Sequence, residues 1–163
     1  MAQATSDEEL QSIDGAILFA RKYLEDLLSF FGVNTDVRAT TEDGEVIELD
    51  IPSTQLNGFL IGQRGDTMRA LQFVVSNALK NKNYTYSRVN VDVAEYKKQR
   101  AERLAETAQE WIKKVKDSGE PYPLQPMNAA DRRIIHKVAG EAGLATESVG
   151  EGRDRHIVLK PAE

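Results

Sequence analysis

The sequence Gly-Gln-Arg-Gly at positions 62–65 has residue types and a spacing suited to holding a phosphate. Glycine has no Cβ, so a phosphodiester backbone can approach such a loop closely. A helix is expected to follow, with Asp66 as its N-terminal cap, and the N–H groups of a helix start favour an anion. Arg64 and Arg69 add positive charge. The alternative is a plain tight turn between two helices.

An apolar groove beside this loop is the expected place for contacts with nucleotide bases. Ile61 precedes the loop and Met68 follows it in the next helix. Together these residues predict a site that clamps about four nucleotides of a single strand. The predicted site consists of Ile61, Gly62, Gln63, Arg64, Gly65, Met68 and Arg69.

A second candidate site lies in the last third of the chain. Arg132 and His136 are four residues apart, so they share one face of the predicted helix. An arginine there can hold a phosphate, and a histidine can form a hydrogen bond or stack on a base. The alternative is a surface pair that only stabilises its helix. The candidate residues are Arg132, Arg133, His136, Arg153 and Arg155.

The elements that must position these residues follow from apolar periodicity and from turn residues. The first part of the chain is expected to form a helix over residues 14–31, strands over 35–41 and 45–51, a short apolar segment, a helix over 66–80 and a strand over 88–93. A long helix over 95–116 comes next, then a helix over 128–142 and strands near 146–149 and 155–159. We interpret Phe19, Phe30, Phe31, Phe73 and Trp111 as packing residues.

This order predicts an α+β protein of two small domains behind a tail. The tail is expected at residues 1–13 as a flexible acidic segment, followed by one domain at 14–94 and another at 95–163. Charge differs between the parts of the chain. Residues 1–52 hold 3 basic and 12 acidic side chains, whereas the rest holds 18 basic and 14 acidic ones. Local charge governs encounter more than net charge does, so the overall −5 argues only weakly against a nucleic-acid partner.

Composition excludes several classes of site. The chain has no cysteine and only two histidines, which excludes disulfides, thiolate metal sites and a histidine-rich metal centre. No cofactor or metal is expected. No apolar run approaches the roughly 20 residues of a membrane span, and the start lacks the features of a signal peptide, so a cytoplasmic protein is expected. Asp43, Glu45, Glu48 and Asp50 are clustered, but on a predicted hairpin they are interpreted as a solvated face.

Residues 35–95 resemble a KH domain of type II, with the element order α-β-β-α-α-β and residues 62–65 as its GXXG loop. Residues 95–163 resemble the R-3-H domain, which takes its name from an arginine and a histidine separated by three residues. A KH domain followed by an R-3-H domain resembles the bacterial Jag/KhpB (SpoIIIJ-associated) family. Members often carry a further N-terminal Jag domain, for which no counterpart is expected in this sequence.

The resemblance implies a non-catalytic protein that binds single-stranded RNA, with single-stranded DNA as an alternative ligand. It implies post-transcriptional or cell-envelope regulation, and a small single-KH protein (KhpA-like) as a partner. The sequence does not predict whether the chain forms homo-oligomers. A protein–protein adaptor that uses both folds without binding RNA is the competing interpretation. An enzyme such as a nuclease is disfavoured, because nuclease sites usually gather carboxylates around a divalent metal.

Overall fold

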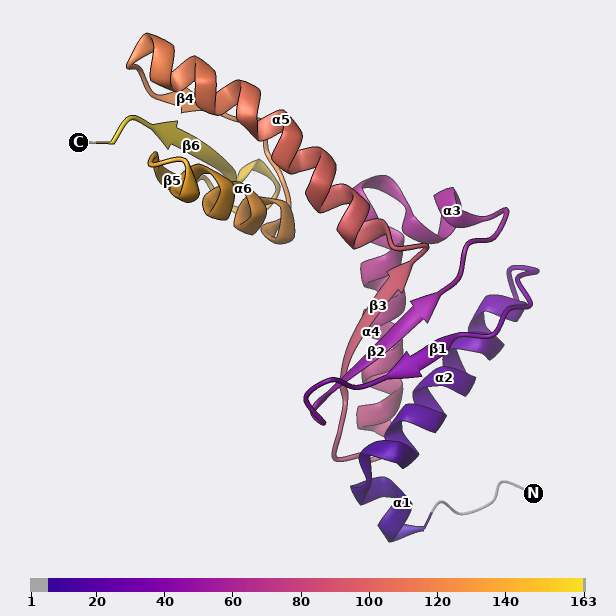
Figure 1. Ribbon diagram of the computed structural model, residues 1–163. Coiled ribbons are helices and arrows are strands. Elements are labelled where there is room, and N and C mark those ends of the chain that lie inside the picture. The colour runs from indigo at the N-terminus through magenta and orange to yellow at the C-terminus, as the bar shows by residue number, and fades with distance from the viewer. Residues whose placement is uncertain (1–5, 163) are drawn as a thin grey trace. The chain divides into compact units, whose positions relative to one another are not determined.

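The computed structural model describes residues 6–162 and divides the chain into two units, residues 1–96 and 97–163. Each unit has its own hydrophobic core and its own three-stranded sheet (Figure 1). The predicted α+β class is confirmed. The division falls two residues after position 94, where the sequence places the end of the first domain.

The N-terminal unit packs two long helices against a mixed sheet. Strand β2 (Val46–Ile51) lies in the middle, antiparallel to β1 (Arg38–Thr40) and parallel to β3 (Arg88–Val93). The parallel pair requires a crossover. That crossover consists of α3 (Asn57–Ile61), the 3-10 turn η1 (Gln63–Gly65) and α4 (Asp66–Asn81). The predicted phosphate loop therefore lies within the connection between two neighbouring strands.

One face of this sheet forms the core of the unit. Side chains alternate along β2 and β3, so every second residue is buried. Helix α2 (Ile13–Ser29) and α4 contact each other, and α2 contacts β1 and β2 while α4 contacts β3. The buried strand residues are Ile47, Leu49, Ile51, Val89, Val91 and Val93. This packing fixes both ends of the crossover and thereby the position of the loop.

Part of the predicted acidic tail is ordered as a short helix, α1 (Asp7–Gln11). Ser6 caps it by accepting a hydrogen bond from the backbone N–H of Glu9. Leu10 packs against the core, and its carbonyl accepts a hydrogen bond of 2.9 Å from the N–H of Thr85. Local capping and one apolar contact explain the helix. Residues 1–5 of the predicted tail lie outside the described residues.

Three phenylalanines that the sequence analysis assigned to packing are exposed, so that expectation is wrong for them. Phe30 is 85% exposed, and Phe31 and Phe73 are exposed as well. The buried stripe of α2 follows Ala16, Ala20, Leu24 and Leu28, but the helix ends at Ser29, so Phe30 and Phe31 lie beyond it. Phe19 and Trp111 are half-buried and pack against the cores of their units.

The C-terminal unit has an antiparallel sheet of order β4-β6-β5. Its core lies between that sheet, α5 (Tyr96–Ser118) and α6 (Ala129–Glu141). The strands are β4 (Tyr122–Pro123), β5 (Ala145–Val149) and β6 (His156–Lys160), with the 3-10 turn η2 (Gly152–Asp154) between the last two. The proline-rich stretch after α5 thus contributes a two-residue edge strand. An edge suits Pro123, because a proline cannot donate to the ladder.

A buried ion pair joins the two helices of the C-terminal unit. The Arg100 guanidinium contacts both carboxylate oxygens of Asp131, at 2.8 and 3.4 Å. Asp131 is 3% exposed. Its backbone N–H donates to the Asn128 side chain at 2.9 Å, which makes Asn128 the N-cap of α6, as the sequence predicts. Asp131 therefore aligns α6 with α5.

Candidate nucleic-acid interface

The backbone between α3 and α4 turns through three unusual conformations within four residues. Gly62, Arg64 and Gly65 have φ angles of 70°, 52° and 81°. Glycine adopts such angles freely, whereas a residue with a Cβ adopts them at a cost. The N–H of Gly65 donates back to the carbonyl of Gly62 at 3.4 Å, which closes the turn. The loop is therefore a fixed turn that projects its two middle residues.

Gly62 is required by space as well as by conformation. A Cβ at this position would lie 2.2 Å from the Thr67 hydroxyl oxygen and 2.8 Å from the Thr67 backbone nitrogen. The backbone nitrogen cannot move far, because Thr67 belongs to the first turn of α4. The sequence analysis did not single out Thr67, since its position against the glycine becomes apparent only in the folded turn.

The start of α4 is open, which differs from the prediction that Asp66 caps it. The N-cap residue is Gly65, and no side chain accepts a hydrogen bond from the first turn. Asp66 has helical backbone angles (φ −64°, ψ −43°), so it is the first residue within the helix. Its carboxylate pairs with the Arg69 guanidinium instead. The Asp66 backbone N–H donates to the Gln63 carbonyl, but without a side-chain cap the helix start keeps a partial positive charge for an anion.

The residues of the predicted loop site differ in what they offer to a ligand. Gln63 and Arg64 are exposed at the tip. Arg69 pairs with Asp66 and donates to the Arg64 carbonyl at 3.1 Å, so it braces the loop. Ile61 is half-buried and packs against the core of the unit. Arg69 is exposed as well, but these two contacts engage its guanidinium within the loop.

Met68 is a correction to the predicted groove. It is 3% exposed and belongs to the core of the N-terminal unit. Its Cε would lie 3.5 Å from a Cβ placed at Gly65. Met68 therefore lies beneath the loop and supports it, and its side chain has no free surface for a base. The reason is its place on the buried stripe of α4, which it shares with Leu71 and Val75.

In the C-terminal unit, Arg132 and His136 share one face of α6 and both are half-buried. An Arg132 Nη1 N–H donates to the Met127 carbonyl at 2.8 Å, which ties α6 to the preceding loop. The Nδ1 atom of His136 is hydrogen-bonded to the Thr146 hydroxyl on β5. Both side chains thus have a structural contact, while the guanidinium keeps further donors and the imidazole keeps its Nε2 atom.

The remaining arginines of the predicted second site are exposed. Arg133 lies beside Arg132 on α6, and Arg153 lies in η2. Arg155 donates through Nε to the Ser148 hydroxyl at 3.0 Å. On the same strand pair, Lys160 is paired with Glu147, and that hydrogen bond lowers the pKa of the Glu147 carboxyl below its ordinary value. All three arginines are thus exposed, and Arg155 is held by its hydrogen bond to Ser148.

Two of the clustered carboxylates of the N-terminal unit have separate structural contacts. Asp43 accepts from the N–H groups of Glu45 and Val46, at 2.8 and 2.9 Å, and these bonds lower the pKa of its carboxyl. Glu48 accepts from the Asn90 amide at 2.6 Å. Within residues 6–162, no group of three or more acidic or histidine side chains is arranged to hold a metal ion.

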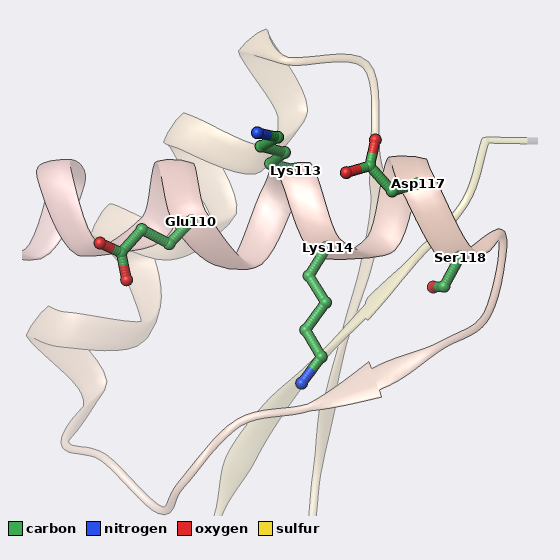
Figure 2. A pocket seen from close by; sticks show the side chains of 5 residues that line it. All are labelled: Glu110, Lys113, Lys114, Asp117 and Ser118. Carbon is green, nitrogen blue, oxygen red and sulfur yellow. The ribbon is translucent and has the colours of Figure 1, made fainter.

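A surface hollow of about 540 Å³ lies along α5. Its lining residues are Glu110, Lys113, Lys114, Asp117 and Ser118, and Figure 2 shows that Lys113 and Lys114 point in different directions. The Lys114 ammonium lies 4.2 Å from the centre of the Tyr122 ring, so a cation–π contact holds it. The lining side chains do not converge on a common point as the groups of a catalytic site would.

Among the described helices, none is both long and apolar enough to cross a membrane.

Comparison with known proteins identifies the second unit and several relatives of the chain. Residues 102–161 match the R-3-H domain family. The chain is 37% identical over 103 residues to the RNA-binding protein KhpB of Clostridium symbiosum, a match that covers 63% of this chain and 46% of that protein. It is 31% identical over 143 residues to the RNA-binding protein KhpB of Bacillus subtilis, covering 86% of this chain and 68% of the relative.

A third relative is the RNA-binding protein KhpB of Streptococcus pneumoniae, at 30% identity over 128 residues, or 76% of this chain and 39% of that protein. The chain thus spans less than half of the Clostridium and Streptococcus relatives, and about two thirds of the Bacillus protein. The Bacillus match runs through most of both chains, and the R-3-H match lies in the unit that carries Arg132 and His136. The chain therefore belongs to the KhpB family.

Proposed function

We propose that this chain binds single-stranded RNA, without catalysing a reaction, and that its N-terminal unit does so as a type II KH domain. The observation that carries the proposal is the open start of α4. No side chain caps the first turn of that helix, and Gln63 and Arg64 extend from the loop at residues 62–65 into solvent. A phosphate placed there meets backbone donors, a helix dipole and a guanidinium.

The C-terminal unit supplies a second contact in this proposal. Arg133 and Arg153 are exposed cations of this unit, and the Nε2 atom of His136 and further Arg132 donors add hydrogen bonds. Each contact can be weak on its own. Two linked sites on one strand gain from effective concentration, so a modest affinity per unit suffices.

A non-catalytic role fits what the acidic and polar groups do in this chain. Asp43 and Glu48 are engaged in hydrogen bonds of the turn and the sheet, and the α5 side chains do not converge. Binding to RNA implies a cytoplasmic location and a part in post-transcriptional regulation. The family resemblance adds a small single-KH protein of the KhpA type as a proposed partner.

The test is fluorescence anisotropy with a labelled single-stranded RNA of about 12 nucleotides. The native chain is compared with a loop variant that combines Gln63→Asp and Arg64→Asp. The matched control combines Lys80→Asp and Asn81→Asp at the exposed far end of the same helix, which changes the charge by the same amount. We expect the loop variant to lose at least about tenfold in affinity and the control to lose much less.

The second contact is tested with Arg133→Ala combined with Arg153→Ala. These exposed residues are preferable to Arg132, because removing Arg132 also removes the hydrogen bond to Met127. A weaker affinity with unchanged thermal stability is expected. Equal affinity of the native chain and the loop variant, with both folded, would contradict the proposal for the N-terminal unit.

A further inference from the structure

The N-terminal unit exposes a cluster of aromatic side chains that its core does not use. Phe30 and Phe31 follow the end of α2, and Phe59 lies on α3 with 52% of its surface exposed. The rings of Phe31 and Phe59 are in contact, with centroids 5.3 Å apart. We call these three residues the phenylalanine surface. Neighbouring residues 27–35 and 52–62 contain no charged side chain, so two uncharged segments meet there.

An acidic hollow adjoins the phenylalanine surface. It has a volume of about 410 Å³, and it is lined by Glu25, Asp26, Ser29, Asn34, Thr35 and Asp36. Ser29 and Asn34 flank Phe30 and Phe31 in the chain. The lining holds three carboxylates; Glu25 is paired with Arg21 and Asp26 with Lys22, each at 3.1 Å on the exposed side of α2. The last turn of α2 also lacks a basic residue, so the negative end of the helix dipole is not balanced within the helix. An apolar centre beside an electronegative rim suits a ligand with apolar and cationic groups.

The phenylalanine surface lies on the flank of α3 away from Ile61. Successive residues of a helix are about 100° apart, so Phe59 and Ile61 point about 200° apart around the axis of α3. The proposed groove for bases lies on the Ile61 side. Carboxylates beside Phe30 would also repel a phosphate backbone. Both observations disfavour RNA as the occupant, and the like charge of two acidic hollows disfavours a second copy of this chain.

We propose that the phenylalanine surface and the acidic hollow together dock a protein segment with apolar and basic side chains. Its apolar residues cover the rings of Phe30, Phe31 and Phe59. A lysine or arginine of the same segment enters the hollow, approaches Asp36 and competes with Lys22 for Asp26; both carboxylates are exposed. Aromatic centres with a charged rim are typical of protein interfaces. The site is separate from the RNA loop, so one chain can hold RNA and a basic protein at once.

The test begins with photocrosslinking of the full chain in cells, with p-benzoylphenylalanine in place of Phe30. Mass spectrometry identifies the crosslinked segment, and that segment is then synthesised as a labelled peptide. We expect a peptide of net positive charge that binds the native chain. Phe30→Ser combined with Phe59→Ser raises its Kd about tenfold or more. Asp26→Asn combined with Asp36→Asn raises the Kd less and makes it less dependent on salt.

A matched control is Phe73→Ser, which removes another exposed phenylalanine, on α4. This variant leaves the peptide Kd unchanged, and RNA binding is unchanged in the Phe30→Ser, Phe59→Ser variant. The proposal is overturned by crosslinks to RNA, by crosslinks to a second copy of this chain, or by a captured segment without basic residues. It is also overturned by an absence of crosslinks, or by a peptide that binds the double serine variant as well as the native chain.

Discussion

Removing the guanidinium of Arg100 tests the role of the buried ion pair in the C-terminal unit. Arg100→Ala leaves the Asp131 carboxylate buried without its charged partner. Breaking such a pair from one side costs about 3–5 kcal/mol. The Arg100 side chain is one third exposed, so water can partly replace it and we expect the lower end, about 3 kcal/mol. With a urea m-value of about 1.5 kcal/mol/M, the unfolding midpoint falls by about 2 M.

The single tryptophan of the sequence, Trp111, makes this change measurable for one unit alone. Trp111 lies on α5 and packs against the core of the C-terminal unit, so its fluorescence follows the unfolding of that unit. Lys98→Ala on α5 is the control, because Lys98 is exposed, and we expect a change within about 0.5 kcal/mol. Adding Asp131→Asn to Arg100→Ala removes the unpaired charge and restores part of the loss.

The reasoning is refuted if Arg100→Ala shifts the midpoint no more than Lys98→Ala does. It is also refuted if the double variant is less stable than Arg100→Ala alone, since the cost would then not come from an unpaired carboxylate.

Three further outcomes follow from local geometry. Gly62→Ala should abolish RNA binding and cost about 2 kcal/mol, because its Cβ meets the first turn of α4. Gly58→Ala, in α3 with open space around it, should leave RNA anisotropy unchanged and should not lower the urea stability. Met68→Ala should lower the melting temperature through a loss of about 2–5 kcal/mol, as expected for a core residue, and a purely surface contact would leave it unchanged. Lys160 lowers the pKa of the Glu147 carboxyl, so this ion pair contributes to stability above pH 4.5, the ordinary pKa of glutamate, and the contribution is lost as the pH falls below that value. Glu147→Gln should therefore flatten the dependence of unfolding stability on pH in the acidic range, and an unchanged dependence would contradict this.

The sequence was sufficient to predict the order of the major elements and the loop that joins α3 to α4. Alternation along residues 46–51 and 88–93 identifies two strands, and glycines with turn residues mark where helices end. The cap Asn128 was predicted because capping is local: it depends on one side chain and an N–H three residues away.

The errors concern interactions that depend on how helices are rotated and packed. The sequence analysis extends the first helix to Phe31, whereas α2 ends at Ser29, so periodicity alone could not show that Leu28 is buried while Phe30 and Phe31 are exposed. Met68 was assigned to a surface groove because its position next to the loop in sequence does not reveal which way it points. The pair of Arg100 and Asp131 joins residues 31 positions apart, and such contacts have no local signal.

The salt dependence of RNA binding tests the central proposal most directly. The affinity of the native chain for single-stranded RNA is measured by anisotropy across a range of salt concentrations, and the measurement is repeated with Arg64→Gln. A protein that neutralises phosphates releases counterions, with a slope of about −0.7 per contact on a logarithmic plot for single strands. We predict a negative slope for the native chain, and a slope smaller in magnitude by about 0.7 for Arg64→Gln. Binding by a folded native chain that is independent of salt, or an identical slope for both proteins, would contradict phosphate recognition by the loop.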